Sequence, residues 1–171
     1  QSDRIRVHEL APGTQEFAVD DFNPAPARRY YWRVFFGKRG STVASFVTNL
    51  PLGSARWITD GNDAAYRPLA LYRHTVNVAK PVKEAFITVA SAGLHEIMLN
   101  GRKVGNHRLD PMFTRFDRRV LSVMHDVTGL LREGGNVVTV ELGNGWYNHQ
   151  STAVWFFHEA SWRNRPRFAA N

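Results

Sequence analysis

Short strands separated by turn-forming residues run along most of the chain, and they constrain its fold more than any other feature. β-Branched, aromatic or alternating segments cover residues 29–36, 42–48, 71–78, 85–90, 95–100, 120–124, 136–142, 153–157 and 167–168. Gly, Pro and Asn separate them at the spacing of roughly 8–12 residues that is typical of all-β domains. The helical pattern is limited to a short turn at residues 126–132. The sequence therefore predicts an all-β chain that forms an antiparallel sandwich or jelly roll.

Local turn chemistry supports several of these assignments. Asn100-Gly101 supplies two residues that tolerate positive φ, as a two-residue hairpin turn of type I′ requires. Asp126 or Thr128 is expected to cap the short turn that follows. Gly143 and Gly145 are expected to let the preceding strand leave the sheet sharply.

The first fifty residues differ in organisation from the rest. The segments at 29–36 and 42–48 are expected to form a hairpin, and the Pro/Gly-rich stretch after them is interpreted as a linker. We therefore expect a partial β module at 1–49, a linker at 50–56 and a β-sandwich at 57–171. Two strands cannot bury both of their faces alone. Either the chain is a segment of a longer protein, truncated before its last strands, or the first hairpin packs on the later sandwich.

The chain is strongly basic, with 22 Lys and Arg against 15 Asp and Glu and a formal net charge of +7. Such a balance is the usual footprint of nucleic-acid binding. The basic residues are dispersed over strands and turns, however, and no basic helix or zinc finger accompanies them. A nucleic-acid-binding β domain is kept as a third hypothesis, and no nucleic acid is expected as a partner. No apolar run approaches the roughly 18 residues of a membrane helix, so no membrane partner is expected.

No catalytic or metal-binding motif is visible in the sequence. The absence of cysteine excludes thiol nucleophiles, Cys-ligated zinc and disulfides. No pair of histidines shows the helical spacing of a metal site; the seven are His8, His74, His95, His107, His125, His149 and His158. The carboxylates Asp20, Asp21, Asp60, Asp63 and Asp117 lie in predicted loops without a candidate partner. We therefore expect no catalytic residue, no metal ligand and no cofactor.

Between residues 71 and 147 a series of motifs follows in a specific order. They are Leu71-Tyr72-Arg73, the segment 90–101 that ends in Asn100-Gly101, Val104-Gly105, the segment 109–119, Asp126-Val127-Thr128, Gly134-Gly135-Asn136 and the segment 142–147. In this order they resemble the N-terminal β-sandwich of bacterial α-L-rhamnosidases of glycoside hydrolase family 78. The earlier segments 30–34 and 44–48 look like the end of the fibronectin-III-like module that precedes this sandwich. The resemblance implies a galactose-binding-like or jelly-roll sandwich.

The resemblance also implies a function. In such enzymes catalysis belongs to a downstream (α/α)6 barrel, where acidic residues act as general acid and general base of an inverting glycosidase. An all-β chain has no room for that barrel. The chain itself is therefore expected to be non-catalytic, and its full-length parent an α-L-rhamnosidase. The expected role is to pack on the catalytic domain of the same polypeptide and shape its active site. A bacterial periplasmic or extracellular location is expected.

The alternative is an independent carbohydrate-binding module, rhamnose-binding or galactose-binding-like as in family 2 glycosidases. Related sandwiches hold rhamnose through a calcium ion and an acidic-plus-amide pair. Here the corresponding stretch is Ala92-Gly93, which offers no carboxylate, so a calcium-dependent site is disfavoured. The candidate sugar-binding residues are Asn144, Trp146, Asp60 and Asp63. An exposed Trp can stack on a sugar ring while an amide fixes hydroxyls; a Trp packed into the sandwich is the competing interpretation.

Overall fold

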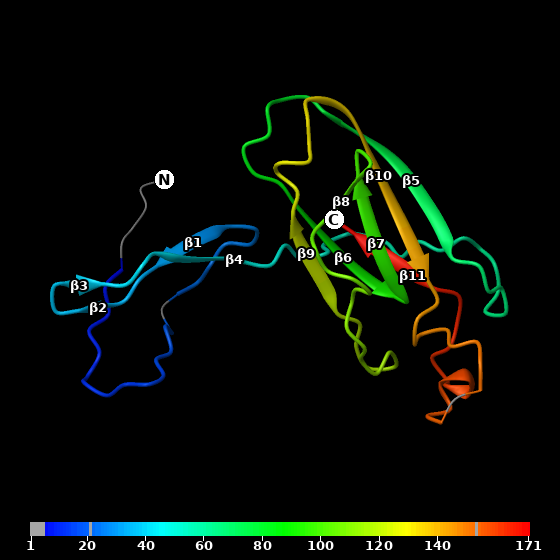
Figure 1. The fold of residues 1–171 in the computed structure, drawn as a ribbon, viewed down its shortest axis with the longest axis horizontal. Helices are drawn as coiled ribbons and strands as arrows, with labels where there is room; N and C mark the ends of the chain where they lie inside the picture. Colours follow the sequence, from blue (N-terminus) through cyan, green and yellow to red (C-terminus); the bar gives the residue numbers. More distant parts are fainter. Residues whose placement is uncertain (1–5, 21, 153) are drawn as a thin grey trace.

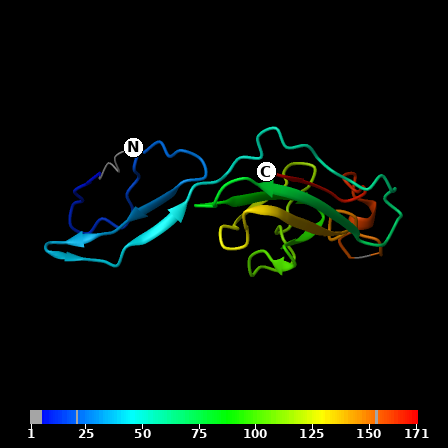
Figure 2. The same ribbon diagram turned by 90° about the horizontal axis from the view of Figure 1, so that it is seen from above.

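The chain folds into antiparallel β-structure in two parts that lie end to end (Figure 1). The computed structural model describes residues 6–20, 22–152 and 154–171. The leading part holds two small strand pairs, β1 (Arg29–Trp32) with β4 (Ala44–Val47) and β2 (Phe35–Phe36) with β3 (Arg39–Gly40). The predicted hairpin is confirmed, although its first strand is interrupted after Trp32. Figure 2 shows the same arrangement from above.

The second part is a sandwich of two sheets. The larger has the order β5 (Ala70–Val78), β10 (Gly134–Gly143), β7 (Leu94–Leu99) and β8 (Arg102–Lys103). The smaller has the order β11 (Arg167–Ala170), β6 (Phe86–Ala92) and β9 (Ser122–Asp126). Every pairing is antiparallel. The predicted all-β antiparallel sandwich is thereby confirmed.

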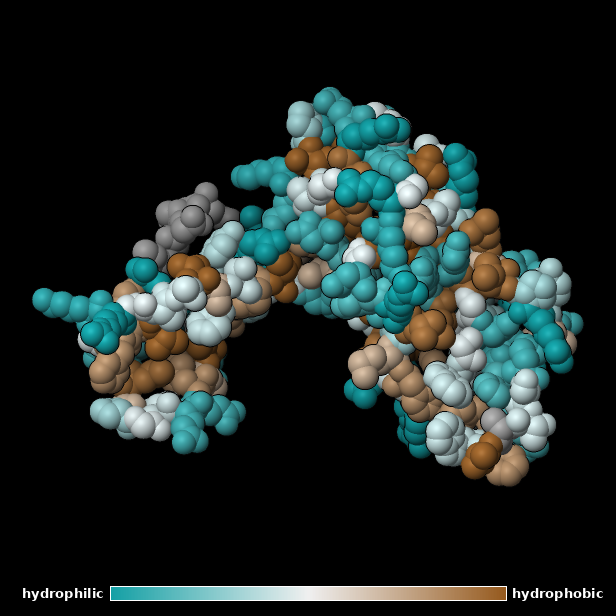
Figure 3. Space-filling model, in the orientation of Figure 1, coloured by the Kyte–Doolittle hydropathy of each residue, from teal (hydrophilic) through white to brown (hydrophobic). Residues whose placement is uncertain are grey.

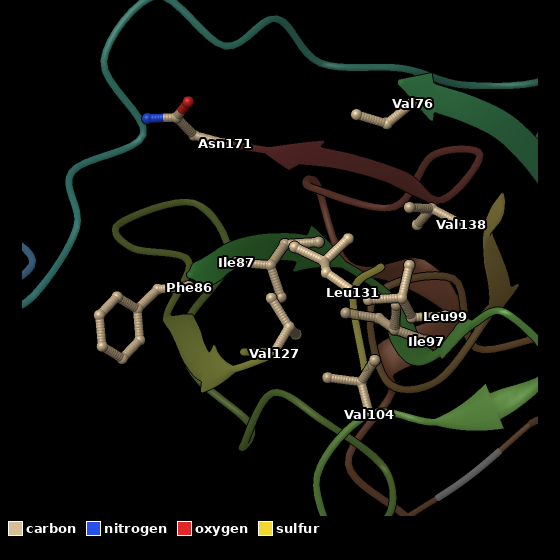
Figure 4. A pocket seen from close by; sticks show the side chains of 10 residues that line it. All are labelled: Val76, Phe86, Ile87, Ile97, Leu99, Val104, Val127, Leu131, Val138 and Asn171. Atoms are coloured by element: carbon tan, nitrogen blue, oxygen red, sulfur yellow. The ribbon is translucent and has the colours of Figure 1, made fainter. Parts of the chain in front are cut away.

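The core lies between these two sheets. Val89 of β6 and Leu142 of β10 are completely buried, and full burial of such a side chain contributes about 1.5–3 kcal/mol. The buried cluster comprises Ala70, Val89, Ile97, Leu99, Val104, Val127, Val140, Leu142 and Phe168. A cavity of about 240 Å³ beside them is lined almost wholly by aliphatic and aromatic side chains (Figure 4). Such a lining offers no set of hydrogen-bonding groups for a hydroxyl-rich ligand.

Two predicted turns form as expected. Asn100 and Gly101 both have positive φ, 53° and 76°, and connect β7 to β8. The Asn100 side chain also donates to Oδ1 of Asn136 at 2.8 Å and accepts from the backbone of Val137 at 2.9 Å, so it ties this turn to β10. Asp126 caps the next turn, because its Oδ1 accepts from the backbone N–H of Thr128 at 3.0 Å.

The short turn predicted at 126–132 is confirmed, because the backbone N–H groups of Leu130 and Leu131 both donate to the carbonyl of Val127. One strand prediction is wrong. The strand predicted at 153–157 is absent from the described part of that segment, which forms a turn and then the short 3-10 helix η1 (Phe157–Glu159). Phe156 has φ 53°, a left-handed conformation that no strand continues through. The aromatic residues here pack on other loop aromatics, and this packing takes the place of cross-strand pairs.

Few interactions join the two parts. The Arg29 guanidinium contacts the carboxylates of Asp126 at 3.0 Å and Glu84 at 3.5 Å. The backbone N–H of Leu50 lies 3.2 Å from the sulfur of Met124. Apolar residues stay at the surface of the leading hairpins (Figure 3). The predicted division into a module at 1–49, a linker at 50–56 and a sandwich at 57–171 stays a prediction.

Among the described residues, the structure contains no helix with the length and apolar character that a membrane span requires.

Candidate functional site

Loops meet around the guanidinium of Arg165 at the end of the sandwich where β5 begins and β10 ends. Arg165 is only 3% exposed. Its Nε donates to Oδ1 of Asp60 at 2.9 Å, and its Nη2 bonds the other carboxylate oxygen. Its Nη1 donates to the carbonyls of Tyr66 and Pro68, both at 3.0 Å. The hydrogen bond from Arg165 lowers the pKa of Asp60, which therefore stays charged. A bidentate pair of this kind fixes the orientation of the two side chains relative to each other, in addition to pairing their charges.

A second set of bonds converges on the carbonyl of Ala64 in the same loop. The side chains of Asn148, Gln150 and Arg163 donate to it at 3.0, 2.8 and 3.3 Å. Asn148 is completely buried. These bonds therefore join the loop before β5 to the long connection between β10 and β11.

Beside this bonded framework lies an aromatic cleft of about 480 Å³, lined by Phe113, Trp146, Trp155 and Phe157. The ring of Trp146 lies 5.7 Å from that of Phe157 and 6.3 Å from that of Trp155. Trp155 is 68% exposed and Trp146 39%. The walls are almost wholly apolar. Such a cleft suits apolar surface from another protein segment better than a ligand that needs many hydrogen bonds.

The four predicted sugar-binding residues are largely occupied by the fold itself. Asp60 bonds Arg165, so the expectation of a partnerless carboxylate is wrong for this residue. Asp63 accepts from the backbone of Ala65 and Tyr66 at 2.8 and 3.1 Å. Asn144 donates to the carbonyl of Arg67 at 2.7 Å, and its oxygen accepts from Asn148 at 2.9 Å. Trp146 is the one of the four whose side chain lines an open cleft. Whether any of them contacts a sugar stays a prediction.

Of the other three loop carboxylates named in the sequence analysis, one has a charged partner in the structure. Asp117 is bonded by the guanidinium of Arg115 at 2.6 Å, so it too has a partner that the sequence did not indicate. Asp20 is exposed, and Asp21 lies outside the described residues.

The fold also brings together two histidines that are far apart in sequence. His95 of β7 and His125 of β9 both lie beside Asp110. One ligand atom from each residue lies within 4.8 Å of the others, and Nε2 of His125 is 3.9 Å from Oδ2 of Asp110. The backbone N–H of His95 donates to the carbonyl of Asp110 at 2.7 Å, which fixes the loop against β7. No local spacing could have predicted this group, because its members come from both sheets and a loop.

Burial sets the charge of these histidines. It lowers the pKa of His95 to about 4, opposed by the nearby Asp110 carboxylate, and it lowers the pKa of His125 as well. Both imidazoles are therefore neutral near pH 7. Ser91 Oγ lies 2.7 Å from Nδ1 of His95, so serine, histidine and aspartate lie close together. Ser91 is completely buried, however, and its hydroxyl cannot reach a substrate as a nucleophile must.

Comparisons with known proteins place the chain beside one group. The model of the family described as the alpha-L-rhamnosidase N-terminal domain matches residues 80–171. An α-L-rhamnosidase of Formosa agariphila is 29% identical over 82% of this chain and 17% of its own length. One from an Alteromonas species is 30% identical over 83% of this chain and 17% of its own length. The chain thus spans about a sixth of the length of these relatives.

Solved structures of α-L-rhamnosidases are also similar to this chain. The α-L-rhamnosidase from Dictyoglumus thermophilum matches with a TM-score of 0.65 and 26% identity, over 85% of this chain and 18% of that one. The α-L-rhamnosidase of Streptomyces avermitilis, complexed with L-rhamnose, matches with a TM-score of 0.52 and 33% identity. That second match covers 62% of this chain and 10% of the other.

Proposed function

Since the chain belongs to the family of α-L-rhamnosidase N-terminal domains, we propose that it is a non-catalytic accessory β-sandwich of an α-L-rhamnosidase-like glycoside hydrolase. Its partner is the catalytic domain of the same polypeptide, against which it packs and whose substrate cleft it shapes. The full-length parent hydrolyses α-L-rhamnosides. A periplasmic or extracellular location of the parent is part of this proposal.

The observation that carries the packing role is the apolar surface around the aromatic cleft. Besides Trp155, the exposed apolar side chains of the loops that border it are Leu109, Met112, Phe113, Val154 and Phe156. Exposed apolar side chains in the loops that border an apolar cleft are typical of a site of contact with another protein surface. The connection between β10 and β11 is anchored by its bonds to the carbonyl of Ala64. The loop after β8 is held to β7 by the backbone bond from His95 to Asp110, so both loops that present the surface are fixed to the sandwich.

The length of the relatives supports the choice of occupant. About five-sixths of each matched α-L-rhamnosidase lies outside the region that this chain covers. An interface within one polypeptide does not have to overcome the loss of translational freedom that separate partners face. A modest apolar patch is therefore sufficient to hold two domains together.

The test uses the full-length polypeptide that contains this sandwich. Trp155→Ser and Met112→Ser should loosen the interface, so that limited proteolysis releases the N-terminal region sooner and kcat/KM for an aryl α-L-rhamnoside falls. The matched control is Leu71→Ser, which removes an exposed apolar side chain of β5 that does not line the cleft. Unchanged cleavage and unchanged kcat/KM in both cleft variants would contradict the packing role.

Sugar binding by an independent module is the second candidate, and the partly exposed Trp146 favours it. Calorimetry with L-rhamnose, with and without calcium, measures it directly. Saturable heat that Trp146→Ala abolishes supports a binding module. If no saturable heat is seen at millimolar sugar, packing on the catalytic domain is the only one of the two candidate functions that remains.

A further inference from the structure

We propose that His95, Asp110 and His125 bind one divalent transition-metal ion, with Zn²⁺ as the ion that their chemistry fits. The three residues come from β7, from the loop after β8 and from β9. A bound ion would therefore join the larger sheet, the smaller sheet and a loop at one point. This site is separate from the aromatic cleft and does not rest on the proposed function.

The spacing of the three side chains is close to that of a zinc site. Zinc ligands lie about 2.1 Å from the metal, so tetrahedral partners are roughly 3.4 Å apart. Here the ligand atoms lie within 4.8 Å of one another, and His125 Nε2 is already 3.9 Å from Asp110 Oδ2. Side-chain shifts of under about 1 Å would bring all three to bonding distance.

The hydrogen bonding of His95 points to a ligand. Its side chain is almost completely buried, and its Nε2 has no hydrogen-bond partner among the described residues. A buried nitrogen without a partner is costly and unusual. Its Nδ1 is bonded to the hydroxyl of Ser91, which leaves Nε2 as the nitrogen available to a metal. Histidine ligands in metal sites characteristically have the second ring nitrogen held in this way.

The donor set selects the class of ion. Two imidazoles and one carboxylate suit zinc and its transition-metal neighbours, whereas calcium and magnesium prefer oxygen ligands alone. The carboxylate offsets part of the charge that a divalent ion would bring into this buried region. A third histidine, His107, also contacts this carboxylate, with its Nδ1 3.2 Å from Asp110 Oδ2. The proposal departs from the sequence-based expectation that the chain has no metal ligand.

The test uses the complete chain after treatment with a chelator. Calorimetric titration with Zn²⁺ should show one equivalent bound with micromolar or tighter affinity and a Tm that rises with bound zinc. Co²⁺ should give the visible absorption of a four-coordinate site. Asp110→Asn, which keeps the side-chain shape, should weaken binding by roughly tenfold or more, and so should His125→Asn. His74→Asn, which changes an exposed histidine of β5, is the matched control.

The outcomes separate a metal site from a purely structural cluster. Absence of saturable binding near one equivalent would overturn the proposal. So would wild-type affinity in Asp110→Asn, or an equal loss in His74→Asn. His125 packs tightly against Gly105, where an added Cβ would lie 2.7 Å from its Nδ1, so His125→Asn can affect folding. If that variant does not fold, Asp110→Asn decides the question.

Discussion

The two parts of the chain bury their apolar residues to very different degrees. Among the described residues before 57, no side chain is fully buried, and Phe36 is 88% exposed. In the sandwich, Val89 and Leu142 are completely buried. Both parts contain aromatic and β-branched strands of similar composition. The difference shows that such residues are sufficient to form strand pairs, while a core requires a second layer.

The leading part illustrates what a single layer achieves. Tyr30 stacks on Phe46 at 5.7 Å, and Phe22 meets Tyr30 edge-on at 4.9 Å. These contacts cover one side of the hairpin and leave Tyr31, Trp32 and its other aromatic residues exposed. Isolated hairpins are at best marginally stable in water. We infer that the leading part depends on contact with further protein surface for its stability. The sandwich is stabilised by its own buried core.

Truncation of a core residue should give the largest effect and the sharpest contrast. Leu142→Ala removes a completely buried side chain from β10 and should lower the free energy of unfolding by about 4 kcal/mol. Phe36→Ala, in the leading part, should change it by less than about 0.5 kcal/mol. Urea denaturation of the complete chain measures both. Similar losses of unfolding free energy in the two variants would contradict the difference in burial between the sandwich and the leading part.

The ion pair that anchors the loops of the sandwich should come next. Asp60→Asn leaves the buried Arg165 guanidinium without its counter-ion and should cost about 3 kcal/mol at pH 7. Asp20→Asn, an exposed carboxylate of the leading part, is the control and should cost almost nothing.

The same pair predicts a pH dependence. The pKa of Asp60 is below its ordinary value of 3.8 in the folded chain, so the unfolded chain takes up the proton first as pH falls. The stabilisation is therefore complete above about pH 5 and is lost as the pH drops below 4. Thermal unfolding between pH 7 and pH 3 should show a smaller loss in Asp60→Asn than in the unsubstituted chain. If the stability of the two proteins falls equally between pH 7 and pH 3, Asp60 is not the source of the pH dependence.

A buried polar network should give a smaller effect. Asn136 is completely buried, accepts from Arg132 and Asn100, and donates to the carbonyls of Arg132 and Gly134. Asn136→Ala leaves these groups unpaired and should cost about 2 kcal/mol. Asn77→Ala, on the exposed strand opposite, is the matched control. Chemical denaturation distinguishes them, and equal effects would mean that the network does not stabilise the sandwich.

Local features of the sequence were the ones that could be predicted. The strands at 71–78 and 136–142 alternate clearly, and Asn100-Gly101 is a turn signal that depends on two adjacent residues. The ordered motifs also pointed to the family that the comparisons show. The strand predicted at 153–157 does not form in the described part of that segment, because Trp and Phe occur both in strands and in loops that form an apolar cleft.

Long-range pairs could not be predicted in the same way. Asp60 and Arg165 meet only because the loop before β5 and the segment before β11 lie at the same end of the sandwich. His95 and His125 come from different sheets, and their approach depends on how those sheets pack. One sequence gives no signal for either contact, so the candidate sites had to come from the fold.

The smallest effect should come from the contact that joins the two parts. Arg29 bonds Asp126 and lies near Glu84 with its side chain about one-third exposed, and ion pairs at that exposure contribute at most about 1 kcal/mol. Arg29→Ala should therefore lower the unfolding free energy of the sandwich by about 0.5 kcal/mol, with Glu84→Gln as the milder control. Denaturation followed by tryptophan fluorescence and by circular dichroism measures whether the parts unfold together. A loss of 2 kcal/mol or more would mean that the leading part stabilises the sandwich through this contact, and that the two parts form one cooperative unit.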